Sequence, residues 1–148
     1  MTSINIKLDG MAQLMEQLKA LGADADDVIL ETITDIVTDT HAFAVQGIQR
    51  GPKSGRIYEK YHPRRTHKAS ASGEYPATDT GQLASSVRMV FPSASNLSGE
   101  VGTAVKYGAW LEFGTSRMAA RPWLFPSFER AKVGVEKEMK LRIEALIK

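Results

Sequence analysis

The three histidines are the first residues to consider for chemistry, because imidazole is a common metal ligand and acid-base group. His41 lies within a predicted helix, whereas His62 and His67 lie in a basic segment. A metal site needs His or carboxylate side chains together on one face, as in the HExxH spacing, and the sequence has no such set. We therefore expect no metal site and no cofactor.

Motifs for nucleophilic catalysis and phosphate binding are also weak. A nucleophile elbow requires Gly-x-Ser-x-Gly between a strand and a helix, and the chain has none. The segment 51–55, Gly-Pro-Lys-Ser-Gly, lacks the Gly-Lys-Ser/Thr ending of a phosphate loop and follows a helix. The chain has no cysteine, which excludes thiolate catalysis and disulfides. We therefore expect a protein that is not an enzyme.

Positive charge is concentrated in one segment. Residues 49–68 carry seven cations against one carboxylate, a net charge of +6, while the rest of the chain carries −4. Gly and Pro residues interrupt this region, so we predict one long loop over 51–77, an extended basic arm. With Tyr58 and Tyr61 between its cations, the arm suits a protein partner, which we favour, a nucleic-acid backbone, or solvation alone. The cations are Arg50, Lys53, Arg56, Lys60, Arg64, Arg65 and Lys68.

A stripe of acidic residues precedes the arm. Four carboxylates recur at every fourth position of a predicted long helix, which places them on one face. Those in the first turns suit the positive end of the helix dipole, whereas the later ones repel each other. Either a solvated face or a surface that meets a basic partner explains the pattern. The four residues are Asp27, Glu31, Asp35 and Asp39.

The aromatic residues cluster near the carboxyl end. Six of the eleven aromatic residues lie in the 22 residues from Tyr107 to Phe128. Such a cluster forms either a corner of the core or an association surface. Glu112 precedes Arg117 and Arg121 by a few positions, and we expect an ion pair between Glu112 and one of these arginines to fix the turn.

Hydrophobic periodicity predicts the elements that position these segments. Period-2 alternation indicates strands, spacing of three and four indicates helices, and turn-forming residues separate them. A connection of about six residues joins the second and third strands as an antiparallel hairpin. The predicted elements are a strand over 3–9, helices over 11–21 and 24–49, a capped helical turn over 78–86, strands over 87–91 and 101–105, a short helix over 107–113 closed by Gly114, and a final helix from about 126.

Composition is that of an ordinary globular chain. The 148 residues are 43% hydrophobic with a net charge of +2, and we expect one domain over 1–148. Neither a leader-like start nor 18 consecutive apolar residues occur, so we expect neither a secreted precursor nor a membrane span. We predict an α+β fold, in which a small antiparallel sheet of three or four strands packs against a long helix and a C-terminal helix.

Three segments resemble the signature of a known family. Residues 80–87 (TGQLASSV), 107–115 (YGAWLEFGT) and 120–126 (ARPWLFP) are similar to motifs of the HK-type tail-component family of long-tailed bacteriophages and prophages. The order of the predicted elements also fits, and the resemblance covers nearly the whole chain. Phe is commoner in the family where Trp123 stands, and a basic residue where Phe125 stands. The positions carried over are Thr80, Gly81, Leu83, Ser86, Tyr107, Trp110, Glu112, Phe113, Gly114, Thr115, Arg121, Pro122 and Trp123.

The resemblance implies a structural protein of the virion, located in the tail or neck and in the host cytoplasm during assembly. It would multimerise at the head-tail junction or the head-proximal tail end, as a tail-completion or head-tail joining protein, with a hexameric ring favoured. Its partners would be itself and other phage neck and tail proteins, with no membrane, no catalytic activity and no favoured DNA contact. A tail terminator that caps the tail tube, or a nucleic-acid-binding module acting through the basic arm, is the alternative.

Overall fold

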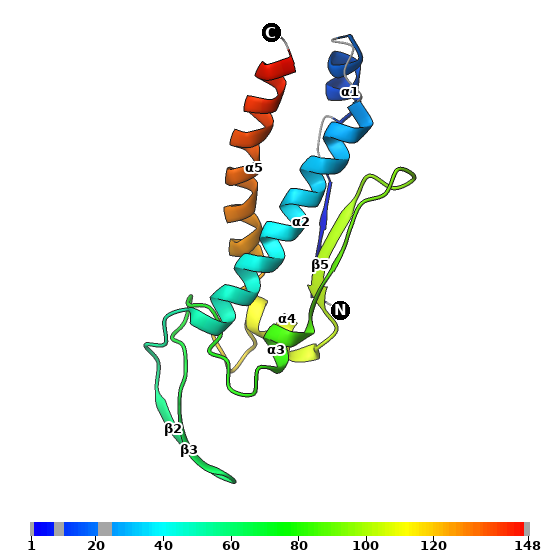
Figure 1. The fold of residues 1–148 in the computed structure, drawn as a ribbon. Coiled ribbons are helices and arrows are strands. Elements are labelled where there is room, and N and C mark those ends of the chain that lie inside the picture. The colour runs from blue at the N-terminus through cyan, green and yellow to red at the C-terminus, as the bar shows by residue number, and fades with distance from the viewer. Residues whose placement is uncertain (1, 8–10, 21–24, 147–148) are drawn as a thin grey trace.

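The computed structural model describes residues 2–7, 11–20 and 25–146 of the chain. No helix in these ranges is both long and apolar enough to span a lipid bilayer. Figure 1 shows the order of the elements. They are β1 (Thr2–Ile6), α1 (Met11–Ala20), α2 (Ala25–Arg50), β2 (Ile57–Tyr61), β3 (Arg64–Lys68), α3 (Gln82–Ser86), β4 (Val87–Val90), β5 (Gly99–Thr103), α4 (Lys106–Phe113) and α5 (Phe125–Leu146).

The predicted α+β class with a small antiparallel sheet is confirmed. Three strands form the sheet in the order β1-β5-β4, so β5 is central and pairs antiparallel with both neighbours. The register places Thr103 opposite Thr2 on one side and opposite Val87 on the other. The long helix α2 contacts all three strands and also packs along α5 (Figure 1).

The core lies around α2 because its apolar residues recur at helical spacing. Ile29, Ile33 and Val37 are fully buried, and they meet Val101 of the central strand within one cluster. Trp123, two residues before α5, belongs to the same cluster. In β4, by contrast, only the first residue is buried, and the strand leaves exposed apolar side chains at the sheet edge.

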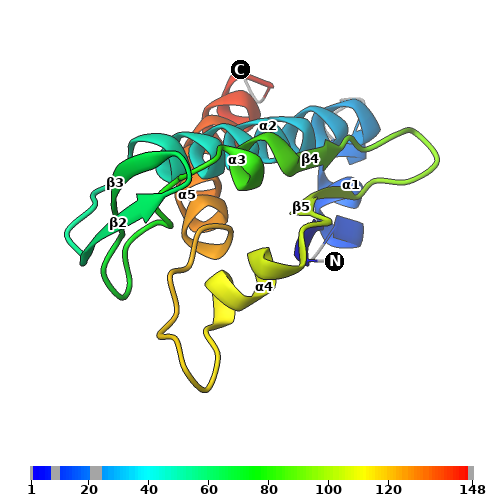
Figure 2. The ribbon, with the colours of Figure 1, turned by 90° about the horizontal axis from the view of Figure 1, so that it is seen from below.

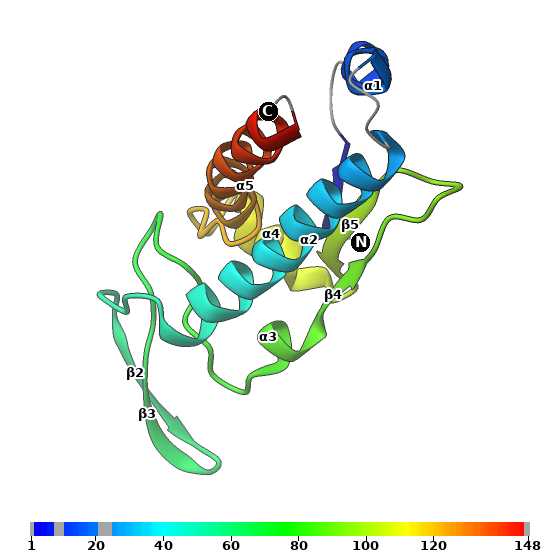
Figure 3. The ribbon, with the colours of Figure 1, turned by 45° about the horizontal axis from the view of Figure 1, so that its top comes forward.

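The prediction of one long loop over 51–77 was wrong for its central part. Residues 57–61 and 64–68 form an antiparallel two-stranded hairpin, with Ile57 opposite Lys68 and Tyr61 opposite Arg64. Strand propensity explains the pairing, because Ile, Tyr and Thr favour extended backbone. The hairpin projects from the C-terminal end of α2 (Figure 3), and the β4–β5 connection extends from the opposite end of the molecule (Figure 2).

Two helical glycines allow a matched test of this packing. The Tyr75 ring lies directly against Gly47 in α2, so a methyl group there would overlap the ring, whereas Gly134 in α5 faces open space. We expect Gly47→Ala to lower the free energy of unfolding by about 1–3 kcal/mol through overpacking. Gly134→Ala should raise it by about 0.5–1 kcal/mol, because alanine is the better helix former.

Urea unfolding of the two variants beside the parent chain measures both effects. If both substitutions changed the free energy of unfolding by the same amount and in the same direction, Tyr75 would not pack on α2 as described.

Candidate functional site

The carboxylate of Glu112 joins α4 to α5. Glu112 is buried, and it accepts hydrogen bonds from the backbone N–H groups of Trp123 (2.8 Å), Leu124 (2.9 Å) and Phe125 (2.9 Å). The first N–H groups of a helix have no partner within the helix, and they form the positive end of its dipole. Glu112 therefore satisfies the start of α5 and fixes its position relative to α4.

This geometry corrects the expected ion pair between Glu112 and an arginine. Arg121 instead donates from Nε to the carbonyl oxygen of Ser70 (3.1 Å), and its backbone N–H donates to Leu111 (2.7 Å). Arg117 is exposed. Backbone N–H groups, and not the arginines, are the partners of Glu112, because three of them point at its buried carboxylate where the chain enters α5.

Trp123 holds the same corner from inside. Its side chain is fully buried, and its indole N–H donates to the carbonyl oxygen of Gly108 (3.0 Å). A Cβ atom on Gly108 would lie 2.6 Å from a methyl carbon of Thr103, so the glycine lets α4 approach the central strand closely. The hydroxyl of Ser86 lies 2.7 Å from that of Thr103, which connects α3 to the same point.

The segment after α4 makes a tight return. Gly114 ends the helix with a φ of 76°, a left-handed value that glycine adopts without strain. Thr115 then donates its N–H to Met118 (2.8 Å), which closes a turn. This turn brings the chain back toward Pro122 and the corner that Glu112 and Trp123 fix.

Three aromatic side chains of this corner face solvent. Phe113 is 79% exposed, and Trp110 and Phe125 are exposed as well. Trp110 and Phe113 are three residues apart in α4 and share one side of it, while the Phe125 backbone is bonded to Glu112. We call Trp110, Phe113 and Phe125 the aromatic surface. Large apolar groups exposed on a rigid corner are typical of interaction sites.

The turn before α3 adopts the geometry that its residues favour. Gly81 has a φ of 78°, and its N–H donates to the hydroxyl oxygen of Thr78 (3.1 Å). The hydroxyl oxygen of Thr80 accepts the N–H of Gln82 (3.4 Å), and Leu83 is buried behind it. Side-chain oxygens of threonine commonly stabilise turns in this way.

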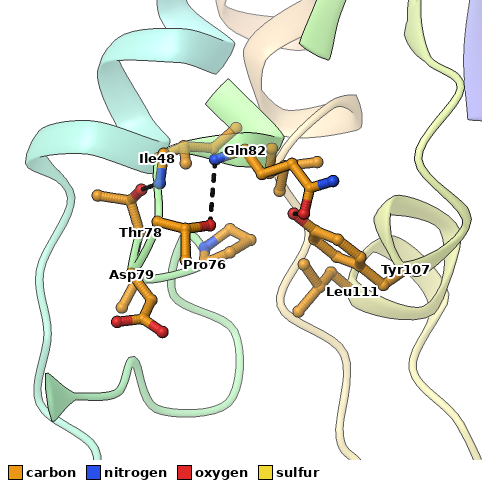
Figure 4. A pocket seen from close by; sticks show the side chains of 11 residues that line it. Ile48, Pro76, Thr78, Asp79, Gln82, Tyr107 and Leu111 are labelled. Atoms are coloured by element: carbon orange, nitrogen blue, oxygen red, sulfur yellow. Dashed lines mark hydrogen bonds between the residues drawn. The ribbon is translucent and has the colours of Figure 1, made fainter. Parts of the chain in front are cut away.

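A pocket of about 260 Å³ lies between this turn, the end of α2 and α4. Figure 4 shows Gln82 and Tyr107 approaching each other across one side, where the Tyr107 hydroxyl lies 3.5 Å from the Gln82 side-chain oxygen. Burial raises the pKa of Tyr107. The Asp79 carboxylate lies on the other side of the lining (Figure 4).

Asp79 anchors the basic hairpin to this turn. Its carboxylate pairs with Lys60 and with Arg65 (3.1 Å), and His67 lies 3.7 Å away. The Lys60 ammonium group, followed by the positive charge of Arg65, lowers the pKa of Asp79. Sequence analysis missed Asp79, although its place between two threonines of the turn is a signal that could have marked it.

A second carboxylate closes the base of the arm. Glu74 accepts hydrogen bonds from the backbone N–H groups of Ser54 (3.1 Å) and Ala71 (2.8 Å), and from the Ser54 hydroxyl. These bonds lower the pKa of Glu74. Of the seven predicted cations, Lys60 and Arg65 pair with Asp79, while Arg50, Lys53 and Arg56 belong to the chain segment that leads into the hairpin.

The acidic stripe lies largely along the seam between α2 and α5. Asp35 and Glu31 pair with Arg142 of α5, at 2.9 Å and 3.7 Å. The pKa of Asp39 is raised, first by partial burial and then by the neighbouring Asp35 and Glu138 carboxylates. Asp27, at the start of α2, is exposed.

Comparison with known proteins finds no matching protein family, no similar curated protein and no similar solved structure. Across residues 2–7, 11–20 and 25–146, no three His, Asp or Glu side chains are grouped closely enough to hold a metal ion. The contacts described above fix the α4–α5 corner and the root of the hairpin, and they leave two surfaces exposed, the aromatic surface and the hairpin.

Replacing Glu112 tests the corner. In Glu112→Gln one of the two acceptor oxygens becomes a donor facing backbone N–H groups, so we expect the free energy of unfolding to fall by about 1–3 kcal/mol. Glu136→Gln, on the exposed side of α5, should change it by less than about 0.5 kcal/mol. Urea unfolding followed by circular dichroism measures both, and similar small effects would contradict the role given to Glu112.

Replacing Asp79 tests the anchor of the hairpin. A carboxyl with a lowered pKa stabilises the folded state above its unfolded value of about 3.9, and that contribution is lost as pH falls through the lowered pKa. NMR shifts of the hairpin amides should therefore change with acid in the parent chain. In Asp79→Asn the amide shifts of the hairpin should already differ from those of the parent at pH 7 and should no longer change with acid in the same way. In Asp27→Asn they should behave as in the parent.

Proposed function

We propose that this chain is a structural protein of a phage virion that assembles into a ring at the head-tail junction or the head-proximal end of the tail. The proposal joins the resemblance of its motifs to the tail-component family with the way those motif residues pack. It assigns no catalytic step to the chain. Its partners would be further copies of itself and neighbouring neck and tail proteins.

The observation that carries the proposal is the corner built by Glu112. The polar groups of the motif residues form hydrogen bonds within the chain. The Glu112 carboxylate bonds to backbone N–H groups at the start of α5, and the Trp123 indole bonds to the Gly108 carbonyl oxygen. The same corner leaves the aromatic surface in solvent. A rigid frame that exposes aromatic side chains supports association with another protein.

The experiment is size measurement of the full chain by light scattering, combined with negative-stain imaging and antibody labelling of phage particles. A ring that labels at the junction of head and tail supports the proposal, whereas labelling at the end of the tube itself indicates a tail terminator. A chain that stays monomeric at high concentration and labels no particle would contradict both.

A nucleic-acid-binding module is the second candidate, because the basic hairpin projects from the body with two exposed tyrosines, Tyr58 and Tyr61. Titration of labelled duplex DNA at 50 mM and 200 mM salt separates this candidate from the first. If the chain remains monomeric and its affinity for DNA is high at 50 mM salt but falls steeply at 200 mM, the nucleic-acid-binding function is favoured.

Truncating the aromatic surface should weaken self-association. We expect Phe113→Ala to raise the dissociation constant between copies at least tenfold, since aromatic anchors at interfaces contribute about 2 kcal/mol or more. The stability of the isolated chain should be unchanged, because Phe113 is 79% exposed. Val133→Ala removes a comparably exposed apolar side chain from α5 and serves as the control. Analytical ultracentrifugation measures both, and equal dissociation constants would remove the aromatic surface from the interface.

A further inference from the structure

The two faces of the hairpin differ in what they contact. Side chains alternate along a strand, so Lys60 and Arg65 share the face that meets Asp79. The opposite face, which we call the outer face, carries Ile57, Glu59 and Tyr61 on β2 and Arg64, Thr66 and Lys68 on β3. All six residues of the outer face are exposed.

The outer face combines apolar bulk with positive charge. Ile57 is 61% and Tyr61 65% exposed, and the register places Lys68 directly opposite Ile57 and Arg64 directly opposite Tyr61. Neither cation has an ion-pair partner among the described residues. Arg64 and Lys68 outnumber the single carboxylate of this face, Glu59. Two large side chains beside a net positive charge form a surface that fits an acidic partner with some apolar area.

Glu59 distinguishes between the possible partners. It lies in the middle of the outer face, where its carboxylate accepts a hydrogen bond from the Tyr61 hydroxyl (3.2 Å). A phosphate backbone laid along this face would be repelled by that carboxylate. A protein surface can place a donor or cation of its own against Glu59, so the outer face favours a protein partner.

The same chain carries a surface of opposite charge. Three carboxylates of α2 and α5 pair with the guanidinium of Arg142, namely Glu31, Asp35 and Glu138, and a fourth, Asp39, lies near two of them. Asp39, the fourth, has no ion-pair partner in the described part of the chain, and its carboxylate lies close enough to Asp35 and Glu138 to be affected by their charge. We call this set the acidic seam, and it retains a net negative charge.

Distance keeps the hairpin away from its own acidic seam. Asp39 lies eleven residues before Arg50, which is about 17 Å along α2. The hairpin leaves from the far end of that helix and projects away from the body (Figures 1 and 3). Contact between the two surfaces therefore joins different copies, and because the surfaces differ, it is a head-to-tail contact that can close a ring.

We propose that the outer face of the hairpin of one copy docks on the acidic seam of a second copy. Arg64 and Lys68 would meet the carboxylates of α2 and α5, while Ile57 and Tyr61 supply the apolar contact area. The proposal rests on the proposed function, for which it names a contact between neighbouring subunits in addition to the aromatic surface.

A charge exchange between the two surfaces tests the contact. The hairpin variant is Arg64→Glu with Lys68→Glu, and Arg65 stays unchanged because it anchors the hairpin to Asp79. The seam variant is Glu31→Lys with Glu138→Lys. Each variant alone sets like charges against each other, so we expect its dissociation constant between copies to rise at least tenfold in analytical ultracentrifugation.

Mixing the two variants in equal amounts should restore assembly, because each hairpin then meets a seam of opposite charge. A misfolded variant could not produce that recovery. The control for the hairpin variant is Lys7→Glu with Arg88→Glu, which makes the same change in net charge at exposed positions outside the hairpin and the seam and should assemble like the parent.

The outcomes separate this contact from the proposed function. If both variants assemble like the parent, the contact is overturned while a ring remains. If the parent chain itself stays monomeric, the ring and the contact both fail. If the hairpin variant still self-associates but loses affinity for labelled duplex DNA, the hairpin serves nucleic acid and the contact is overturned.

Discussion

The carboxylate of Glu112 is the interaction on which the arrangement of this chain depends most. Its three bonds to backbone N–H groups set where α5 begins, and α5 in turn packs along α2, the helix that contacts every strand of the sheet. A buried carboxylate is costly unless it is fully hydrogen-bonded, and the start of a helix supplies aligned donors without adding a second side chain. The space around the corner is therefore free for Trp123 and Gly108 to pack closely.

Two further carboxylates place the hairpin in the same manner. Glu74 binds the backbone at the base of the arm, and Asp79 binds the inner face through Lys60 and Arg65. Neither anchor uses the apolar core. The hairpin thus keeps a fixed root while its outer face, with Arg64 and Lys68 against the single carboxylate of Glu59, stays available with a net positive charge.

The sequence predicted the fold class, the long helix α2 and the hairpin β4–β5, because hydrophobic periodicity follows both helical burial, as in α2, and the alternation of an extended strand, which β4 keeps although only Val87 of it is buried. It failed for β2–β3, where both faces are largely polar or exposed, so Ile57 and Tyr61 carry no alternating signal. It named Glu112 but predicted the wrong partner, an arginine, since the partners of this side chain are backbone groups that every residue possesses. Charge patterning located the cations correctly in one segment, but only the register shows which of them share a face with Asp79.

An isolated two-stranded hairpin is marginally stable in water, because it has no core of its own. This one is held at its root by Glu74 and Asp79, and its outer face exposes Ile57 and Tyr61. Most of the apolar area that the hairpin could bury is thus still in solvent in the single chain. A surface that covers the outer face would stabilise the hairpin and the assembly together. Because Arg64 lies on this face opposite Tyr61, an acidic partner surface would bury apolar area and pair with a cation in the same contact.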